Sequence, residues 1–164
     1  MRGVTPLHIA LAILIIAAGS IAGAWIFQAL GYVPCELCLK ERIPYYAGIV
    51  LAAFAALLSV SGRTRFLPAV FAGLAVIFAA GAALGVYHSG VEWGFWPGPS
   101  DCTGAFDGAG SVNDFLKQLQ SVKVARCDVV SLRVFGLSLA VWNAAISIFL
   151  AGLSAFALTL NPRR

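Results

Sequence analysis

The chain alternates long apolar runs with short polar connections. Four runs contain no Asp, Glu, Lys or Arg, and they cover residues of about 7–30, 43–60, 66–87 and 135–160. A run of about 20 residues can cross roughly 30 Å of hydrocarbon as a helix. Small residues such as Gly73, Gly81 and Gly85 recur within these runs, and small residues let helices approach closely in lipid. The pattern predicts an all-α, polytopic membrane protein: residues 1–164 form a single integral membrane domain, a four-transmembrane-helix bundle.

Composition supports a bilayer as the solvent of this chain. Of its 164 residues, 60% are hydrophobic and only 11% are charged, with a mean hydropathy of +0.90. Soluble domains carry about 25% charged residues, and a soluble fold of this size could not bury so much apolar surface. The net charge of +4 does not indicate nucleic-acid binding, because the basic residues form no single patch.

The charges in the connections predict the orientation of the bundle. The two termini and the turn between the second and third runs contain basic residues and no acidic ones: Arg2, Arg63, Arg65, Arg163 and Arg164. Four spans place these segments on one face, and the positive-inside rule makes that face cytoplasmic. The other two connections, about 31–42 and 88–134, then lie outside. They contain all seven acidic residues and all four cysteines.

A helical pattern interrupts the longer outer connection. Apolar side chains recur at helical spacing from Val112 to Val122, with polar residues between them. This pattern predicts a short amphipathic helix that lies flat on the membrane. Cys102 and Cys127 flank this segment, so we expect that they need not stay fixed relative to the bundle.

The cysteines are the candidate reactive groups. Cys35 and Cys38 form a Cys-x-x-Cys motif, whose disulfide is easily reduced and whose thiolate local charge can stabilise. An extracytoplasmic compartment permits stable disulfides. Four cysteines allow three pairings, and the two pairs could exchange through mixed disulfides.

Polar residues near the motif suggest further roles. Arg42 lies four residues beyond Cys38; if a helix starts near Cys38, the helix N-terminus and the guanidinium should lower the pKa of this thiol. Arg42 could also hold a carbonyl oxygen, or it could be an ordinary snorkelling residue. His88 could approach the same region or serve only as a structural hydrogen-bonder. We expect Glu41 to partner a base or a cap rather than to act in proton transfer, and Asn143 to hydrogen-bond another helix.

The motif resembles that of a known family. Pro34-Cys35-Glu36-Leu37-Cys38, followed by Glu41-Arg42, resembles the P-C-x-L-C-x-x-E-R signature of the bacterial disulfide bond formation protein B (DsbB) family. The resemblance, to a divergent branch, extends over four spans and a Gly136-Leu137-Ser138-Leu139-Ala140 motif that opens the last one. It implies a thiol:quinone oxidoreductase of the bacterial inner membrane that supports protein disulfide bond formation. Such an enzyme reoxidises a periplasmic thioredoxin-fold, DsbA-like oxidase and reduces ubiquinone or menaquinone, with no metal.

The resemblance also implies a role for each site residue. Cys102 would form the mixed disulfide with the partner, and Cys127 would resolve it. Cys35 would exchange with this loop pair, and Cys38 would be the thiolate that faces the quinone. The quinone ring would bind Arg42, with His88 as a further contact.

Three other interpretations stay open from the residues. A quinone oxidoreductase of the vitamin K epoxide reductase type also combines a helical bundle with such cysteine pairs, but its Cys-x-x-Cys motif is expected later in the bundle. A structural membrane protein could use two disulfides only to hold its outer loops. A metal site with four thiolate ligands is disfavoured because Cys102 and Cys127 lack Cys-x-x-Cys spacing.

Overall fold

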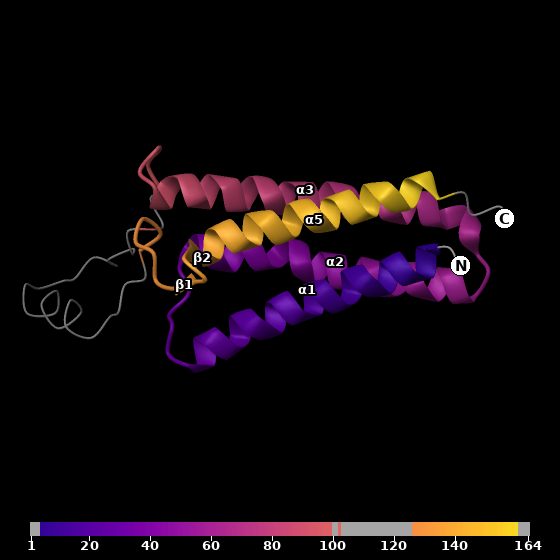
Figure 1. Cartoon of the computed structure of the whole chain (residues 1–164), viewed down its shortest axis with the longest axis horizontal. Coiled ribbons are helices and arrows are strands. Elements are labelled where there is room, and N and C mark those ends of the chain that lie inside the picture. The colour runs from indigo at the N-terminus through magenta and orange to yellow at the C-terminus, as the bar shows by residue number, and fades with distance from the viewer. Residues whose placement is uncertain (1–3, 100–101, 103–125, 161–164) are drawn as a thin grey trace, which may run out of the picture.

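Four long helices make up most of the part of the chain that the structure, a computed structural model, describes: residues 4–99, 102 and 126–160. They are α1 (Pro6–Ala29), α2 (Glu36–Val60), α3 (Leu67–Glu92) and α5 (Leu139–Thr159). The helices lie side by side along one axis (Figure 1). Each is long and apolar enough to cross a membrane. The predicted all-α bundle of four membrane-spanning helices is confirmed.

The two ends of the bundle carry different connections. The α1–α2 connection, the end of α3 and the start of α5 share one end, while the N-terminal end of α1 and the C-terminal end of α5 lie at the other (Figure 1). The short 3-10 helix η1 (Thr64–Phe66) joins α2 to α3 at that second end. Arg63 and Arg65 are therefore at the opposite end of the bundle from the Cys-x-x-Cys motif.

Local capping explains where the helices begin. Thr5 accepts a hydrogen bond from the backbone N–H of His8 (3.4 Å), and Pro6 occupies the first turn of α1, where its missing N–H costs nothing. The Cys35 sulfur caps α2 by accepting from the backbone N–H of Cys38. Ser138 caps α5 by accepting from the backbone N–H of Val141 (3.3 Å).

The helix that contains the second predicted span begins before the apolar run. The α2 helix begins at Glu36 rather than near residue 43, so most of the predicted connection 31–42 is helical. The charged residues between 36 and 42 break the apolar run but not the helix, because Glu36 favours a helix N-terminus and pairs with Lys40 one turn later (3.5 Å). Cys38 therefore lies inside the first turn of α2.

The third and fourth helices also differ from prediction. The α3 helix continues past residue 87 to Glu92, and α5 starts at Leu139 rather than near 135. A hairpin of two short antiparallel strands, β1 (Arg133–Val134) and β2 (Leu137–Ser138), replaces the expected first turn of α5. Its turn places Phe135 and Gly136 at positive φ (51° and 83°), which a helix does not permit. The amphipathic helix predicted between Val112 and Val122 lies outside the described residues.

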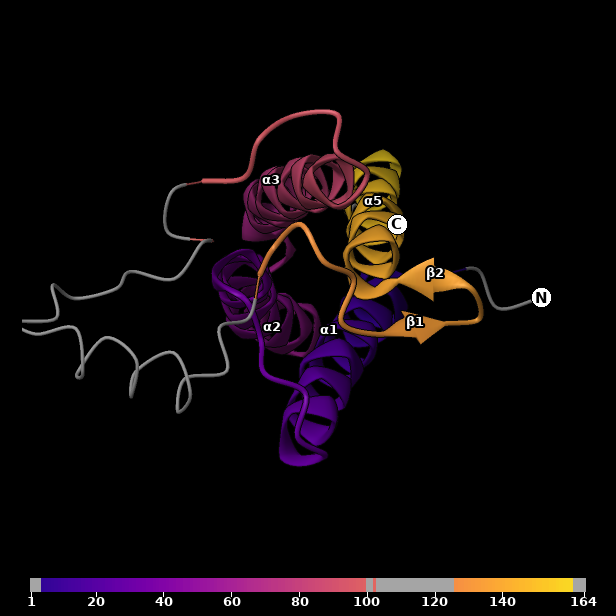
Figure 2. The ribbon, with the colours of Figure 1, turned by 90° about the vertical axis from the view of Figure 1, so that its left-hand side faces the viewer.

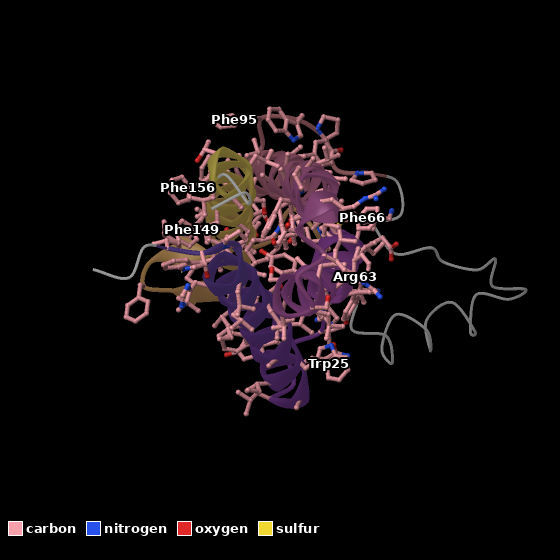
Figure 3. The ribbon with its side chains drawn as sticks, turned by 90° about the vertical axis from the view of Figure 1, so that its right-hand side faces the viewer. Trp25, Arg63, Phe66, Phe95, Phe149 and Phe156 are labelled. Atoms are coloured by element: carbon pink, nitrogen blue, oxygen red, sulfur yellow. A yellow bond between two sulfur atoms is a disulfide. The ribbon has the colours of Figure 1, made fainter. Side chains whose placement is uncertain are left out.

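Packing separates an interior from an apolar perimeter. Ile13, Phe71 and Phe78 are almost completely buried between the helices. Close approach needs glycine, because a Cβ on Gly85 would lie 2.7 Å from the backbone nitrogen of Ala144 in α5. In contrast, Trp25, Phe149 and Phe156 point outward from the bundle (Figure 3). An apolar perimeter of this kind is what hydrocarbon requires of a membrane protein.

Candidate active site

Three buried cysteines and the partly buried Cys38 gather in one cluster at the end of the bundle where α2 begins. The cluster comprises Cys35, Cys38, Cys102 and Cys127, packed with Leu37 and Val91. Cys102 and Cys127 form a disulfide, while Cys35 and Cys38 are free thiols. Two pairs that are far apart in the sequence thus belong to one packed cluster.

The β1–β2 hairpin and the chain before it cover this end beside α5, as Figure 2 shows. The indole of Trp142 donates to the carbonyl oxygen of Val134 (2.9 Å), and the Ser138 hydroxyl donates to the carboxylate of Glu92. These two contacts attach the hairpin to α5 and to α3, which holds the residues after Cys127 against the bundle.

Cys35 receives the contacts that stabilise a thiolate. Its sulfur accepts from the backbone N–H of Cys38 (3.2 Å) and lies 3.6 Å from Nε2 of His88. The hydrogen bond from the Cys38 thiol, together with His88 and the backbone N–H, outweighs burial and lowers the pKa of Cys35 to about 5. A position at a helix N-terminus acts in the same direction.

The sequence had placed this stabilisation on Cys38, through Arg42. The structure instead directs Nη1 of Arg42 to Oε1 of Gln28 in α1 (2.9 Å). Cys35 receives the stabilising contacts because α2 begins at Glu36. Cys35 is therefore the capping residue, and the backbone N–H and thiol of Cys38 donate hydrogen bonds to its sulfur.

His88 and Glu41 extend the site into the bundle. Nδ1 of His88 lies 3.0 Å from Oε1 of Glu41, and the two residues are 3% and 8% exposed. The expectation that Glu41 partners a base is confirmed. The two nitrogens of one imidazole therefore contact a thiol and a carboxyl group, which gives a continuous Cys35–His88–Glu41 chain.

A cavity of about 300 Å³ opens beside this chain and is lined by residues of α1, α2, α3 and α5. Gly19 and Gly23 form part of its wall on α1, where an added Cβ would meet nothing within 4 Å. Much of the wall is apolar, with side chains such as Phe27 and Ile146. Polar and reactive side chains also border the cavity: Gln28, Cys35, Cys38, Glu41, Arg42, His88 and Asn143. The structure thus brings both predicted quinone contacts, Arg42 and His88, to the same cavity as the Cys-x-x-Cys pair.

Asn143 lies beside Glu41 of α2, where its side chain can make the hydrogen bond to another helix that the sequence predicted. The approach is loose, because no atom among the described residues meets the full hydrogen-bond geometry for its buried Nδ2. Its place on the cavity wall also makes the amide accessible to a ligand. The signal in the sequence was a carboxamide inside an apolar run. Gln28 near the end of the first run carried the same signal.

Three side chains of the site lie close enough together to be considered as metal ligands. The ligand atoms of Cys35, Cys38 and His88 lie within 4.8 Å of one another. Structural zinc sites almost always use four ligands, and the four-thiolate site considered from the sequence is not formed here because Cys102 and Cys127 are joined to each other.

Comparison with protein families places this site in context. A family model described as "Disulfide bond formation protein DsbB" matches residues 6–157. The chain belongs to the DsbB family. Comparison with curated proteins finds no match, and neither does comparison with solved structures.

Membership of the DsbB family identifies the chain as a membrane oxidoreductase of disulfide bond formation. All four cysteines fall within the matched residues, and the reactive pair, the second pair and the cavity meet at one end of a DsbB-type four-helix bundle. The family match favours DsbB over the vitamin K epoxide reductase type and over a purely structural protein.

Proposed function

We propose that this protein oxidises a periplasmic DsbA-like, thioredoxin-fold dithiol and passes the two electrons to a membrane quinone, ubiquinone or menaquinone. The observation that carries this proposal is the position of the Cys35–Cys38 pair. It packs in one cluster with the Cys102–Cys127 disulfide and also lines the cavity. Such a pair can receive electrons from a thiol and deliver them to a small oxidant.

The outer step is thiol–disulfide exchange. A thiolate of the partner attacks Cys102, the Cys127 thiolate leaves, and the partner's second thiol then releases the oxidised partner with Cys102 reduced. Cys102 is only 5% exposed, so the partner must displace part of its cover. The division of roles between Cys102 and Cys127 follows the family resemblance.

The inner step is exchange within the cysteine cluster. A thiolate of the reduced outer pair attacks Cys35 of an oxidised Cys35–Cys38 pair, and Cys38 leaves. The second outer thiolate completes the exchange, which restores the Cys102–Cys127 disulfide and leaves Cys35 and Cys38 reduced. This is the distribution of thiols and disulfide in the structure. No electrons are lost, because each disulfide formed replaces one broken.

The cavity fits the ring of a quinone. Its volume of about 300 Å³ is at the lower end of the range for ligand sites, which suits a ring whose prenyl tail extends into lipid. The side chains of Arg42 and Asn143 border the cavity and can donate hydrogen bonds to ring oxygens. When bound, the quinone takes up two electrons and two protons as Cys35 and Cys38 form their disulfide.

We also infer the orientation in the bacterial inner membrane. Arg63 and Arg65 lie at the opposite end of the bundle from the cysteine cluster, and the positive-inside rule places basic connections in the cytoplasm. The cysteine cluster then faces the periplasm, where disulfides persist.

Turnover of purified protein in detergent tests the proposal. A reduced thioredoxin-fold dithiol and a short-chain quinone are mixed with the protein, and loss of quinone absorbance is followed. We expect Cys38→Ser to abolish turnover and Arg42→Ala to raise the KM for quinone, with Arg63→Ala, at the other end of the bundle, as the matched control. Turnover that survived Cys38→Ser would overturn the proposed redox route. An unchanged KM in Arg42→Ala would remove only the role of Arg42.

A further inference from the structure

The reaction has a proton balance that the cysteines alone do not explain. Oxidising two thiols to a disulfide releases two protons, and reducing a quinone to a quinol consumes two. Cys35 is 3% exposed, so its proton has no direct path to water. Cys35 and Cys38 both border the cavity, but the Cys35 sulfur faces Nε2 of His88, which makes the imidazole the nearest acceptor for the Cys35 proton.

We propose that His88 and Glu41 form a proton relay that carries the Cys35 proton to the quinone cavity. The inference rests on the proposed function and adds Glu41 as a catalytic residue. The geometry supports it directly: 3.6 Å from the Cys35 sulfur to Nε2 of His88, and 3.0 Å from Nδ1 to Oε1 of Glu41. Glu41 itself borders the cavity.

Each transfer in the relay is balanced. The Cys35 thiol gives its proton to Nε2 of His88, while the proton on Nδ1 moves to Oε1 of Glu41. This leaves a thiolate, a neutral imidazole and a carboxylic acid. Cys35 and Cys38 then form their S–S bond and give up two electrons, and the quinone receives one proton from Glu41 and one from Cys38. Because the pKa of Cys35 is lowered to about 5, the transfer from Cys35 is already complete at neutral pH, and the His88–Glu41 pair holds the proton before the S–S bond forms.

The other titratable groups at the cavity have different partners. Among the described residues, Glu92 accepts from Ser138, Arg126 donates to Asp128, Arg42 donates to Gln28, and the Tyr45 hydroxyl contacts Ser147. Only Glu41 contacts the far nitrogen of His88. Burying an ionisable residue within a membrane span costs free energy, so such residues usually have a function. A role in proton transfer would account for the position of Glu41.

A carboxyl group beside a histidine could also serve only to orient the ring, so the test must separate the two roles. Glu41→Gln does so, because the amide oxygen still accepts a hydrogen bond from Nδ1–H but cannot take the proton. Glu36→Gln is the matched control: it makes the same charge change on α2, at a side chain that is 41% exposed and pairs with Lys40.

Two half-reactions are measured with the full-length protein in detergent. The first is reduction of the protein by excess dithiol without quinone, read as free thiols. The second is the single-turnover loss of quinone absorbance when the reduced protein meets a short-chain quinone. We expect Glu41→Gln to leave the first unchanged and to slow the second about 10²-fold, the usual lower contribution of general acid–base catalysis. Glu36→Gln should leave both unchanged.

Several outcomes would overturn the relay. Quinone reduction by Glu41→Gln at the wild-type rate would exclude proton transfer through Glu41, and equal slowing of both half-reactions would indicate a structural role. If Glu41→Gln does not fold, Glu41→Asp serves as the second variant, because it keeps a carboxyl group on a shorter side chain. Glu41→Asp should show a wild-type rate in the first half-reaction and a solvent deuterium isotope effect on the second. Loss of that isotope effect would contradict the relay. A wild-type protein that reduces no quinone would instead refute the proposed function.

Discussion

Cys35 should titrate about four pH units below an ordinary thiol, because its contacts lower the pKa from 9.0 to about 5. At pH 7 this makes Cys35 about 99% thiolate, compared with about 1% for a thiol of pKa 9. The largest cause is the hydrogen bond from the Cys38 thiol, followed by the opposing effect of burial and then by His88. Removing the Cys38 donor is therefore the most informative perturbation.

Two substitutions separate the donor from the packing. Cys38→Ala removes the side-chain donor, whereas Cys38→Ser replaces it with a hydroxyl donor. The backbone N–H at position 38, 3.2 Å from the Cys35 sulfur, remains in both. In a protein whose Cys102 and Cys127 are replaced by alanine, Cys35 is then the only thiol. We expect its pKa to rise in both variants and to rise further in Cys38→Ala.

The midpoint of titration is the correct measurement, not the reaction rate at pH 7. Thiolate nucleophilicity falls with pKa, with a Brønsted slope of about 0.4–0.5, so a shift of about four units costs roughly 40- to 100-fold in intrinsic rate. That loss nearly cancels the gain in thiolate fraction. Absorbance of the thiolate and alkylation by iodoacetamide should be followed between about pH 4 and pH 10, which covers the lowered and the ordinary thiol pKa.

A midpoint near the ordinary value in the protein that retains Cys35 and Cys38 would refute this reasoning. So would equal midpoints in Cys38→Ser and Cys38→Ala.

The lowered pKa of Cys35 also affects the stability of the fold. Because the folded pKa lies below the unfolded one, the thiolate stabilises the fold fully above about pH 9, and this contribution is lost as the pH falls to about 5.

Three further substitutions test the cavity and the packing. Gly23→Leu should raise the KM for quinone without unfolding the protein, because its Cβ enters open space at the cavity wall; Gly152→Leu, which also meets nothing, should leave the KM unchanged. Gly85→Ala should lower stability by about 1–3 kcal/mol, since its Cβ would meet the backbone of Ala144; an unchanged melting temperature in detergent would contradict this. Tyr45→Phe should cost about 0.6 kcal/mol in chemical unfolding, the average for a hydrogen bond between membrane helices, and a larger loss would mean that its hydroxyl does more than join α2 to α5.

The sequence by itself determined the membrane architecture. Run length and hydropathy depend only on local composition, so four uncharged runs were enough to predict four spans. Local information failed where a helix continued through charged residues. Hydropathy does not show whether Glu36 to Arg42 form a helix or a loop. Because α2 begins at Glu36, Cys35 rather than Cys38 caps the helix.

Only the tertiary structure decided which side chains of the site contact one another. His88 is 53 residues from Cys35 and 47 from Glu41, and only the packing of α3 against α2 brings one imidazole between them. The pairing of Cys102 with Cys127 was one of three that the sequence allowed. Side-chain partners across such distances depend on helix rotation and depth, which no local pattern encodes, because neighbouring helices contribute the opposing surface.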